Sequence, residues 1–333
     1  MRDSFSGKKL DGEGYVYNTY GEEKYLHHAV ASVVTLRRYD LKRPIAIFCS
    51  EHHAELLKSE KLNHLFTKVY ILPEENRSIT GFKHNVDRFM PFEKNLYLDS
   101  DIIWCKNPDL LWQSFSPYRY TITGNQTSDN FFGGPKGFGI LKDVLFRKRN
   151  RTLKKFGLTY LSRVQSGMIY ASDYQLTAKV CKWAKKMLND KHLTHFRSRK
   201  EESGRSEESC EWSLAMAMSK LELQVYPWFY GYISPQLDFI ENFTDYDTDF
   251  KTVSCLYYSN KTVYNLRGFP VEWIQKLLLK FLTIFPGKRD HLYVTPFCLH
   301  FGWYHQKQPF FDFADRIWKE IHSDITDTEY KIA

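Results

Sequence analysis

The chain has 333 residues and a formal net charge of +8, with 43% hydrophobic and 26% charged residues. This balance provides enough apolar material for a large core and excludes an intrinsically disordered chain. The six cysteines are scattered without a Cys-x-x-Cys pair, so we expect reduced thiols and no disulfide framework.

The sequence contains no segment typical of membrane targeting. Residues 1–15 lack an apolar core, and the longest apolar stretch, residues 273–285, is short and carries two lysines. We therefore expect neither a signal peptide nor a transmembrane helix, and we expect a cytoplasmic protein.

Two basic clusters, residues 142–155 and 179–200, would attract polyanions such as nucleic acid, membrane headgroups or a phosphorylated acceptor. Their Lys and Arg alternate with apolar residues at helical spacing, which favours ordinary solvated helix faces. Because no nucleic-acid-binding motif is present, we expect no nucleic-acid partner. Peripheral membrane contact stays open, because residues 273–285 form an amphipathic run, although core packing is the commoner role of such a helix.

Strands and helices are predicted to alternate along the first hundred residues. Strand patterns occupy residues 14–18, 44–49 and 68–72, and apolar residues recur at helical spacing in 22–39 and 52–62. This alternation predicts βαβ units, and hence an α/β fold with a mostly parallel central sheet flanked by helices on both faces.

The rest of the chain mixes further strands and helices with loops. Predicted strands cover 95–98, 120–124 and 165–171, and predicted helices cover 174–189, 211–221 and 312–322. We expect a Gly-rich loop at 133–139 and a polar loop or lid at 195–208. After Pro227 we expect an aromatic, loop-rich region.

A carboxylate pair follows one of these strands. Asp99-Ser100-Asp101 comes directly after the apolar run 95–98, and apolar character resumes at Ile102. In open α/β sheets, ligands bind beyond the carboxyl ends of the strands. Two carboxylates there suit a hard divalent cation whose remaining positions a substrate diphosphate fills. A lone Asp-x-Asp is also common in surface turns, but charges beside an apolar strand are costly unless a metal or basic groups compensate them.

Residues 83–104, KHNVDRFMPFEKNLYLDSDIIW, combine a basic residue, a Pro-Phe turn and an LDxD motif. This stretch resembles the donor site of metal-dependent glycosyltransferases with the GT-A fold, a Rossmann-like nucleotide-diphospho-sugar transferase fold. It is most similar to retaining enzymes of the glycogenin and galactosyltransferase-like family. The resemblance implies a hexosyltransferase that moves sugar from a nucleotide-diphosphate sugar, with UDP favoured, to a hydroxyl of an unknown carbohydrate, protein or lipid acceptor.

Three further segments fit the same family. The first strand and turn, YVYNTY, resembles the part that grips uracil and ribose, and QSGMIYA resembles a strand whose small residues let the donor sugar approach. HFG at 300–302, followed by Lys307 and Pro309, resembles a C-terminal motif that supplies a third metal ligand and a lysine for the diphosphate. The resemblance covers roughly residues 14–310.

The resemblance assigns site residues as follows. The implied metal ligands are Asp99, Asp101 and His300, and the imidazole favours Mn²⁺ over Mg²⁺. The implied donor-binding residues are Tyr17, Asn18, Thr19, Lys83, Asp99, Ser100, Asp101, Ser166, Gly167, Gly302 and Lys307. The candidate catalytic residues are Gln165, Glu211 and Lys307.

The C-terminal segment departs from the family pattern. Gly302 comes one residue early, Lys307 stands two residues before Pro309, and Phe310 replaces a Trp. His305 therefore competes with His300 as the third ligand. Glu211-Trp212 replaces an Asp-Gln pair, so Glu211 either holds donor sugar or acceptor, or is an acid favoured by the dipole at a helix N-terminus.

We expect one GT-A domain over 1–333, with a nucleotide-binding half at 14–115, a half for the acceptor and donor sugar at 116–310, and a C-terminal helix and tail at 311–333. Two other functions stay open. A sugar-1-phosphate nucleotidyltransferase would share the fold, but 17–23 lack the Gly-rich loop with Arg and Lys that such enzymes carry. A catalytically inactive nucleotide-sugar-binding protein would keep the fold without turnover.

Overall fold

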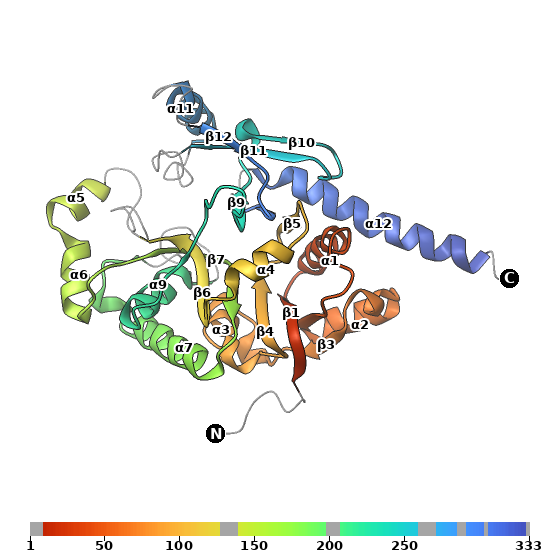
Figure 1. The fold of residues 1–333 in the computed structure, drawn as a ribbon, viewed down its shortest axis with the longest axis horizontal. Helices are drawn as coiled ribbons and strands as arrows, with labels where there is room; N and C mark the ends of the chain where they lie inside the picture. The colour runs from red at the N-terminus through yellow and green to blue at the C-terminus, as the bar shows by residue number, and fades with distance from the viewer. Residues whose placement is uncertain are drawn as a thin grey trace.

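Strands and helices alternate along the first part of the chain (Figure 1). The computed structural model describes residues 9–126, 139–197, 207–258, 271–284, 291–302 and 306–330. The strands are β1 (Leu10–Thr19), β2 (Ile45–Cys49), β3 (Lys68–Ile71), β4 (Phe92–Leu98), β5 (Ile102–Trp104), β6 (Tyr120–Asn125), β7 (Arg163–Ala171), β8 (Tyr226–Pro227), β9 (Gln236–Asp238), β10 (Thr244–Tyr246), β11 (Val253–Tyr258), β12 (His291–Val294) and β13 (Cys298–His300).

The helices lie between these strands and at the C-terminal end. They are α1 (Lys24–Arg37), α2 (Glu51–Ser59), α3 (Ile79–Lys83), α4 (Asp109–Phe115), α5 (Gly139–Leu145), α6 (Lys148–Phe156), α7 (Tyr174–Asn189), α9 (Glu211–Lys220), α11 (Glu272–Ile284) and α12 (Gln308–Tyr330). Short 3₁₀ segments occur at Leu62–Leu65, Glu74–Asn76, Val86–Arg88, Lys191–Leu193 and Glu241–Phe243. Within the described ranges, no helix combines the length and the apolar character needed to cross a bilayer.

A seven-stranded sheet forms the centre, in the order β3-β2-β1-β4-β7-β6-β8. Parallel pairings join β3 to β2, β2 to β1, β1 to β4 and β6 to β8, whereas β7 runs antiparallel to both β4 and β6. The prediction of an α/β fold with a mostly parallel central sheet is therefore confirmed.

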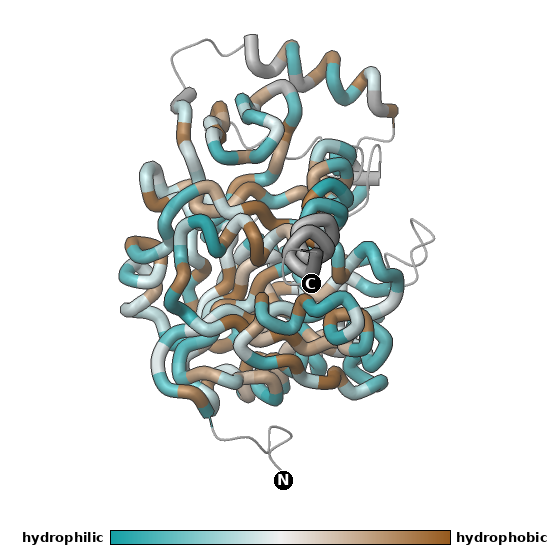
Figure 2. The backbone as a smooth tube through the Cα atoms, turned by 90° about the vertical axis from the view of Figure 1, so that its right-hand side faces the viewer, coloured by the Kyte–Doolittle hydropathy of each residue, from teal (hydrophilic) through white to brown (hydrophobic). Residues whose placement is uncertain are grey.

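Alternate side chains of each strand are buried on opposite faces of this sheet. Along β1, Tyr15 and Tyr17 belong to a core shared with α1 and α4, whereas Val16 belongs to a core shared with α7 and α9. This follows from the period of two, because successive side chains of a strand point to opposite faces. Figure 2 shows hydrophobic segments running through the interior of the molecule.

A smaller core lies beside the main sheet. The strands β5, β13 and β9 form a three-stranded sheet, and β10, β11 and β12 form another. Buried side chains of α12, among them Phe310, Phe313 and Ile317, pack into a core with Leu237 and Leu299 of the first small sheet. The small sheet matters for function because β5 continues from the end of β4.

The C-terminal region differs from the prediction of loops. The strands β8 to β13 have two to six residues each, too few for a clear alternating pattern, and most of them pair with residues distant in the sequence. The amphipathic run at 273–285 forms α11, and Trp273, Leu277 and Phe281 on one side of it are 67%, 58% and 57% exposed. The predicted loop at 133–139, apart from its last residue, and residues 198–206 of the predicted lid lie outside the described residues.

Candidate metal and donor site

Two carboxylates stand at the carboxyl end of β4. Asp99 continues the pairing of β4 with β7, because its N–H donates to the carbonyl of Gly167 at 3.0 Å. The chain turns at Ser100, and Asp101 directly precedes β5. This is the edge of the sheet at which α/β proteins commonly hold ligands.

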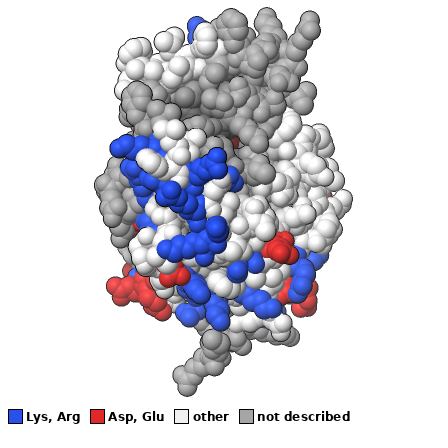
Figure 3. All heavy atoms as spheres, turned by 90° about the vertical axis from the view of Figure 1, so that its left-hand side faces the viewer, with Lys and Arg blue, Asp and Glu red and all other residues white. Residues whose placement is uncertain are grey.

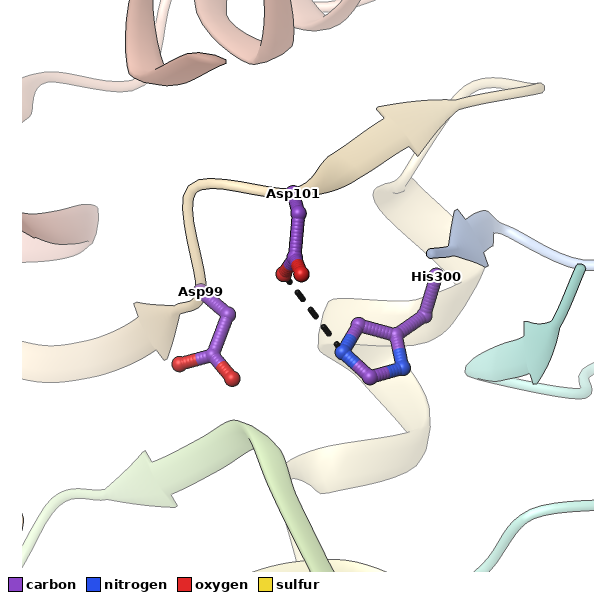
Figure 4. A group of neighbouring side chains, drawn as sticks. All are labelled: Asp99, Asp101 and His300. Carbon is purple, nitrogen blue, oxygen red and sulfur yellow. Dashed lines mark ion pairs between the residues drawn. The ribbon is translucent and has the colours of Figure 1, made fainter. Parts of the chain in front are cut away.

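A histidine from the C-terminal region completes the cluster. The antiparallel pairing of β5 with β13 sets His300 opposite Ile102, and the N–H of Phe301 donates to the carbonyl of Asp101 at 3.0 Å. Asp99, Asp101 and His300 can each offer one ligand atom, and these atoms all lie within 4.8 Å of one another. Figure 4 shows the three side chains converging, with Nε2 of His300 3.5 Å from Oδ1 of Asp101. Two carboxylates and one imidazole fit a divalent cation such as Mn²⁺.

Two lysines balance the two carboxylates. Nζ of Lys83 lies 2.6 Å from Oδ1 of Asp99, and Nζ of Lys307 lies 2.6 Å from Oδ2 of Asp101. Burial raises the pKa of Asp101, but the nearby charges of Lys307 and His300 lower it by more, so this pKa lies well below its usual range. For Lys83, burial lowers the pKa, but the charge of Asp99 raises it by more, so this pKa lies above its usual value. Asp101 and Lys83 are therefore charged at neutral pH.

A third carboxylate, Asp238, holds the far side of the histidine ring. The parallel pairing of β9 with β13 aligns Asp238 with His300, and its Oδ1 lies 2.7 Å from Nδ1 of His300. Gln165 on β7 donates to the same Oδ1 at 2.5 Å, and its Nε2 is also 2.7 Å from Nδ1. Since Nδ1 cannot donate to Asp238 and accept from Gln165 at once, the charged carboxylate takes the Nδ1 proton and Gln165 supports Asp238. This arrangement leaves Nε2 facing the carboxylate pair.

Burial lowers the pKa of His300, whereas Asp101 and Asp238 raise it by more, so the net direction is upward. Without a metal, the ring therefore holds its proton more tightly than a free imidazole does. A cation that bound to Nε2 would displace that proton, which couples metal affinity to pH.

Gly167 lies where a larger residue would press on this cluster. A Cβ at this position would stand 3.3 Å from Nε2 of His300 and 3.1 Å from Oε1 of Gln236. The family resemblance implies small residues here that let a donor sugar approach, and the contacts give a separate reason for glycine. Its neighbour Ser166 accepts a hydrogen bond from Lys83 at 3.0 Å.

A small hollow, too narrow for a water molecule, lies beside Asp99. It is lined by Asn18, Lys83, Asp99 and Ser166, together with apolar side chains from α3, β4, β7 and the turn after α3. All four of these polar or charged residues belong to the predicted donor site, so the structure brings them together.

The predicted nucleoside contacts from β1 divide between two faces. The structure differs from the expectation at Tyr17, whose side chain is fully buried, with its hydroxyl 3.0 Å from that of Ser32. Thr19 is also buried, with Oγ1 3.1 Å from Nδ1 of His53 on α2. Of the three, Asn18 lines the hollow, because residue 18 lies on the opposite face of the strand from residues 17 and 19.

The candidate catalytic residues are placed unequally. Glu211 is the first residue of α9, and its charge acts on Lys83. Gln165 is buried and its amide is engaged with Asp238, so its role in the structure is to position other side chains. Lys307 contacts Asp101 directly, while Gly302 lies two residues beyond His300. The competing ligand, His305, lies outside the described residues.

Sequence reasoning missed Asp238. It ends a strand of three residues, and no motif surrounds it. A carboxylate that orients a metal-ligating histidine is a common feature of metal sites, so the prediction of His300 could have prompted a search for such a partner, but only the pairing of β9 with β13 identifies it.

No protein-family model matches the chain, and no curated protein matches its sequence. Among solved structures, it is similar to mouse xyloside xylosyltransferase 1, with a TM-score of 0.45 and 12% identity over 70% of this chain and 88% of that one. It is also similar to the galactosyltransferase LgtC in complex with donor and acceptor sugar analogues, with a TM-score of 0.47 and 11% identity over 95% and 96% of the two chains. A third is the apo glycosyltransferase GlyE of Streptococcus pneumoniae TIGR4, with a TM-score of 0.48 and 10% identity over 96% of this chain and 64% of that one.

Proposed function

We propose that the protein is a metal-dependent glycosyltransferase that moves a hexose from a nucleotide-diphosphate sugar, with UDP favoured, to an acceptor hydroxyl. The observation that carries the proposal is the convergence of Asp99, Asp101 and His300, three ligand groups from two separate segments of the chain, beside Lys83, which contacts Asp99. The sequence resemblance to GT-A glycosyltransferases, and within them to the retaining glycogenin and galactosyltransferase-like family, supports the same reading.

The proposed donor site has a charge balance suited to a diphosphate. Asp99 and Asp101 are each paired with one lysine, so the two pairs carry little net charge. A divalent cation, when bound by these aspartates and His300, would add positive charge that stabilises a departing diphosphate. Lys83 and Lys307 would add fixed positive charge at the same place, which is electrostatic stabilisation by preorganised groups.

The remaining residues would orient and hold the reactants. Asp238 and Gln165 fix the His300 ring so that Nε2 points toward the carboxylates. Asn18 would contact the nucleoside, and Ser166 the donor sugar. Glu211, at the start of α9 and near Lys83, would contact the sugar or the acceptor. Retention of configuration is proposed from the resemblance alone.

The first test is calorimetric titration of UDP into the protein, once with Mn²⁺ and once with EDTA, for the wild type and for Asp101→Asn. We expect binding only in the wild type with Mn²⁺, and then slow hydrolysis of one UDP-sugar in the absence of acceptor. Equal UDP affinity with EDTA, or in Asp101→Asn, would contradict the proposed metal-dependent donor site. Binding of UDP without hydrolysis of any UDP-sugar, with every candidate acceptor tried, would favour an inactive nucleotide-sugar-binding protein.

A further inference from the structure

The corner between α5 and α6 exposes a run of apolar side chains. Val144, Leu145 and Phe146 are 44%, 78% and 55% exposed, and they are consecutive in the sequence. Arg147, which precedes α6, has a left-handed backbone with φ of 47° and forms the sharp corner. Adjacent large apolar side chains on a surface commonly mark a contact with a membrane or another molecule.

The same corner carries most of the net positive charge of the chain. Residues 139–157 contain seven Lys or Arg and one acidic residue, a net charge of +6, against +8 for the whole chain. On α6, Arg151, Lys154 and Lys155 are exposed, whereas Thr152 faces inward. The basic side chains therefore form an outer face of the helix that begins at the apolar corner.

The one acid within residues 139–157, Asp143, offsets a single one of these seven positive charges. Asp143 is 6% exposed and already paired with Lys148 at 2.7 Å. The basic surface continues onto the end of α9 at Lys220, whose Nζ donates to the carbonyl of Phe156 at 3.3 Å and lies 5.7 Å from the ring centroid of Trp183 on α7. Figure 3 shows Lys and Arg gathered on this flank of the molecule.

We propose that this surface, defined by Leu145, Phe146 and the exposed cations of α6, docks the protein on an anionic lipid bilayer. A membrane is the partner that takes both features at once, because apolar side chains enter the boundary between headgroups and acyl chains while cations contact anionic headgroups. A nucleic acid would use the cations but leave Leu145 and Phe146 in water. Figure 1 shows α5 and α6 at the outer edge of the molecule. A protruding corner can contact a flat membrane surface, whereas a bound peptide would need a groove.

The test is co-sedimentation of the full chain with vesicles of phosphatidylcholine alone, or with 30% phosphatidylserine added, at physiological salt. We expect binding to the anionic vesicles only. Substitution of Arg151, Lys154 and Lys155 by Gln should weaken it about a hundredfold, since each cation near an anionic surface contributes about fivefold. Leu145→Ser with Phe146→Ser should weaken it by about tenfold, through the lost burial of apolar area.

Matched controls come from the opposite side of the molecule. Lys42, Lys58 and Lys68, all exposed, are replaced by Gln to give the same change in charge, and Leu41 and Ile71, 80% and 49% exposed, are replaced by Ser. Both control sets should bind vesicles like the wild type, and circular dichroism should show that every variant is folded. The proposal is overturned by equal binding to neutral vesicles, by equal losses in test and control sets, or by an apolar double variant that binds normally. Binding to duplex DNA that is tighter than binding to anionic vesicles, and that is unchanged by the substitutions at Leu145 and Phe146, would assign the surface to nucleic acid.

Discussion

Replacing Asp238 by Asn tests whether this carboxylate positions the third metal ligand. Asn keeps the size of the side chain and one acceptor oxygen, but it removes the negative charge that lies 2.7 Å from Nδ1 of His300. A hydrogen bond to a charged group contributes about 1.5–3 kcal/mol, and a neutral one about 1 kcal/mol. The expected difference is thus about 0.5–2 kcal/mol, which overlaps the roughly 10- to 100-fold losses found when partners of metal ligands are changed. We expect Mn²⁺ affinity to fall by about tenfold.

The assay is electron paramagnetic resonance of free Mn²⁺ in titrations without nucleotide, at pH 7 and pH 8.5. Removing the charge of Asp238 also lowers the pKa of His300, which would favour metal by weakening competition from protons. Competition from protons is weaker at the higher pH, so a loss of equal size at both pH values reports orientation of the ring. Asp245→Asn, an exposed carboxylate on β10, removes the same charge elsewhere and should bind Mn²⁺ normally. If Asp238→Asn binds Mn²⁺ like the wild type while His300→Ala does not, the positioning role of Asp238 is refuted.

Two further predictions concern stability and packing. Burial lowers the pKa of His84 to about 4, so the unfolded chain binds more protons than the folded one between pH 6.5 and 4, and stability falls as pH drops through this window. In urea unfolding, this residue should lower the free energy of unfolding by about 2 kcal/mol between pH 7.5 and 5. His84→Asn should make the free energy of unfolding less dependent on pH in this range, and an unchanged pH dependence in this variant would contradict the prediction. Gly167→Ala adds a methyl group 3.3 Å from Nε2 of His300, so it should weaken Mn²⁺ binding and lower the free energy of unfolding by about 1–3 kcal/mol. Unaltered Mn²⁺ affinity and melting temperature in this variant would show that the side chains around residue 167 can shift to accept the methyl group.

The fold of the first half could be predicted because its strands and helices carry continuous apolar patterns. The strands at 44–49 and 68–72 each lie within a residue of their observed bounds, and the carboxylate pair follows its strand directly. The sequence also supplied His300 and Lys307 through their resemblance to a motif, and both contact Asp101 in the structure.

What was missed depends on pairing between distant residues. Asp238 contacts His300 because β9 pairs with β13, and a strand of three residues is too short for its sequence to predict the strand with which it pairs. Tyr17 was expected to contact the nucleoside from the resemblance of its segment to the family's first strand, and because β1 is apolar on both faces, its pattern does not show that the Tyr17 side chain is buried on the face opposite Asn18. The α5–α6 corner was expected to be an ordinary solvated face, since sequence spacing does not reveal that Leu145 and Phe146 are exposed.

The cluster joins parts of the chain that are separated by nearly two hundred residues, since Asp99 and Asp101 lie between β4 and β5 whereas His300 is the last residue of β13. An ion held by all three residues would link the main sheet to the small sheet of β5, β13 and β9. Resistance to proteolysis at the C-terminal end should then rise with Mn²⁺, and a truncated chain ending before β13 would keep both aspartates yet lose this response. Metal affinity thus becomes a reporter of whether the two ends of the molecule have assembled.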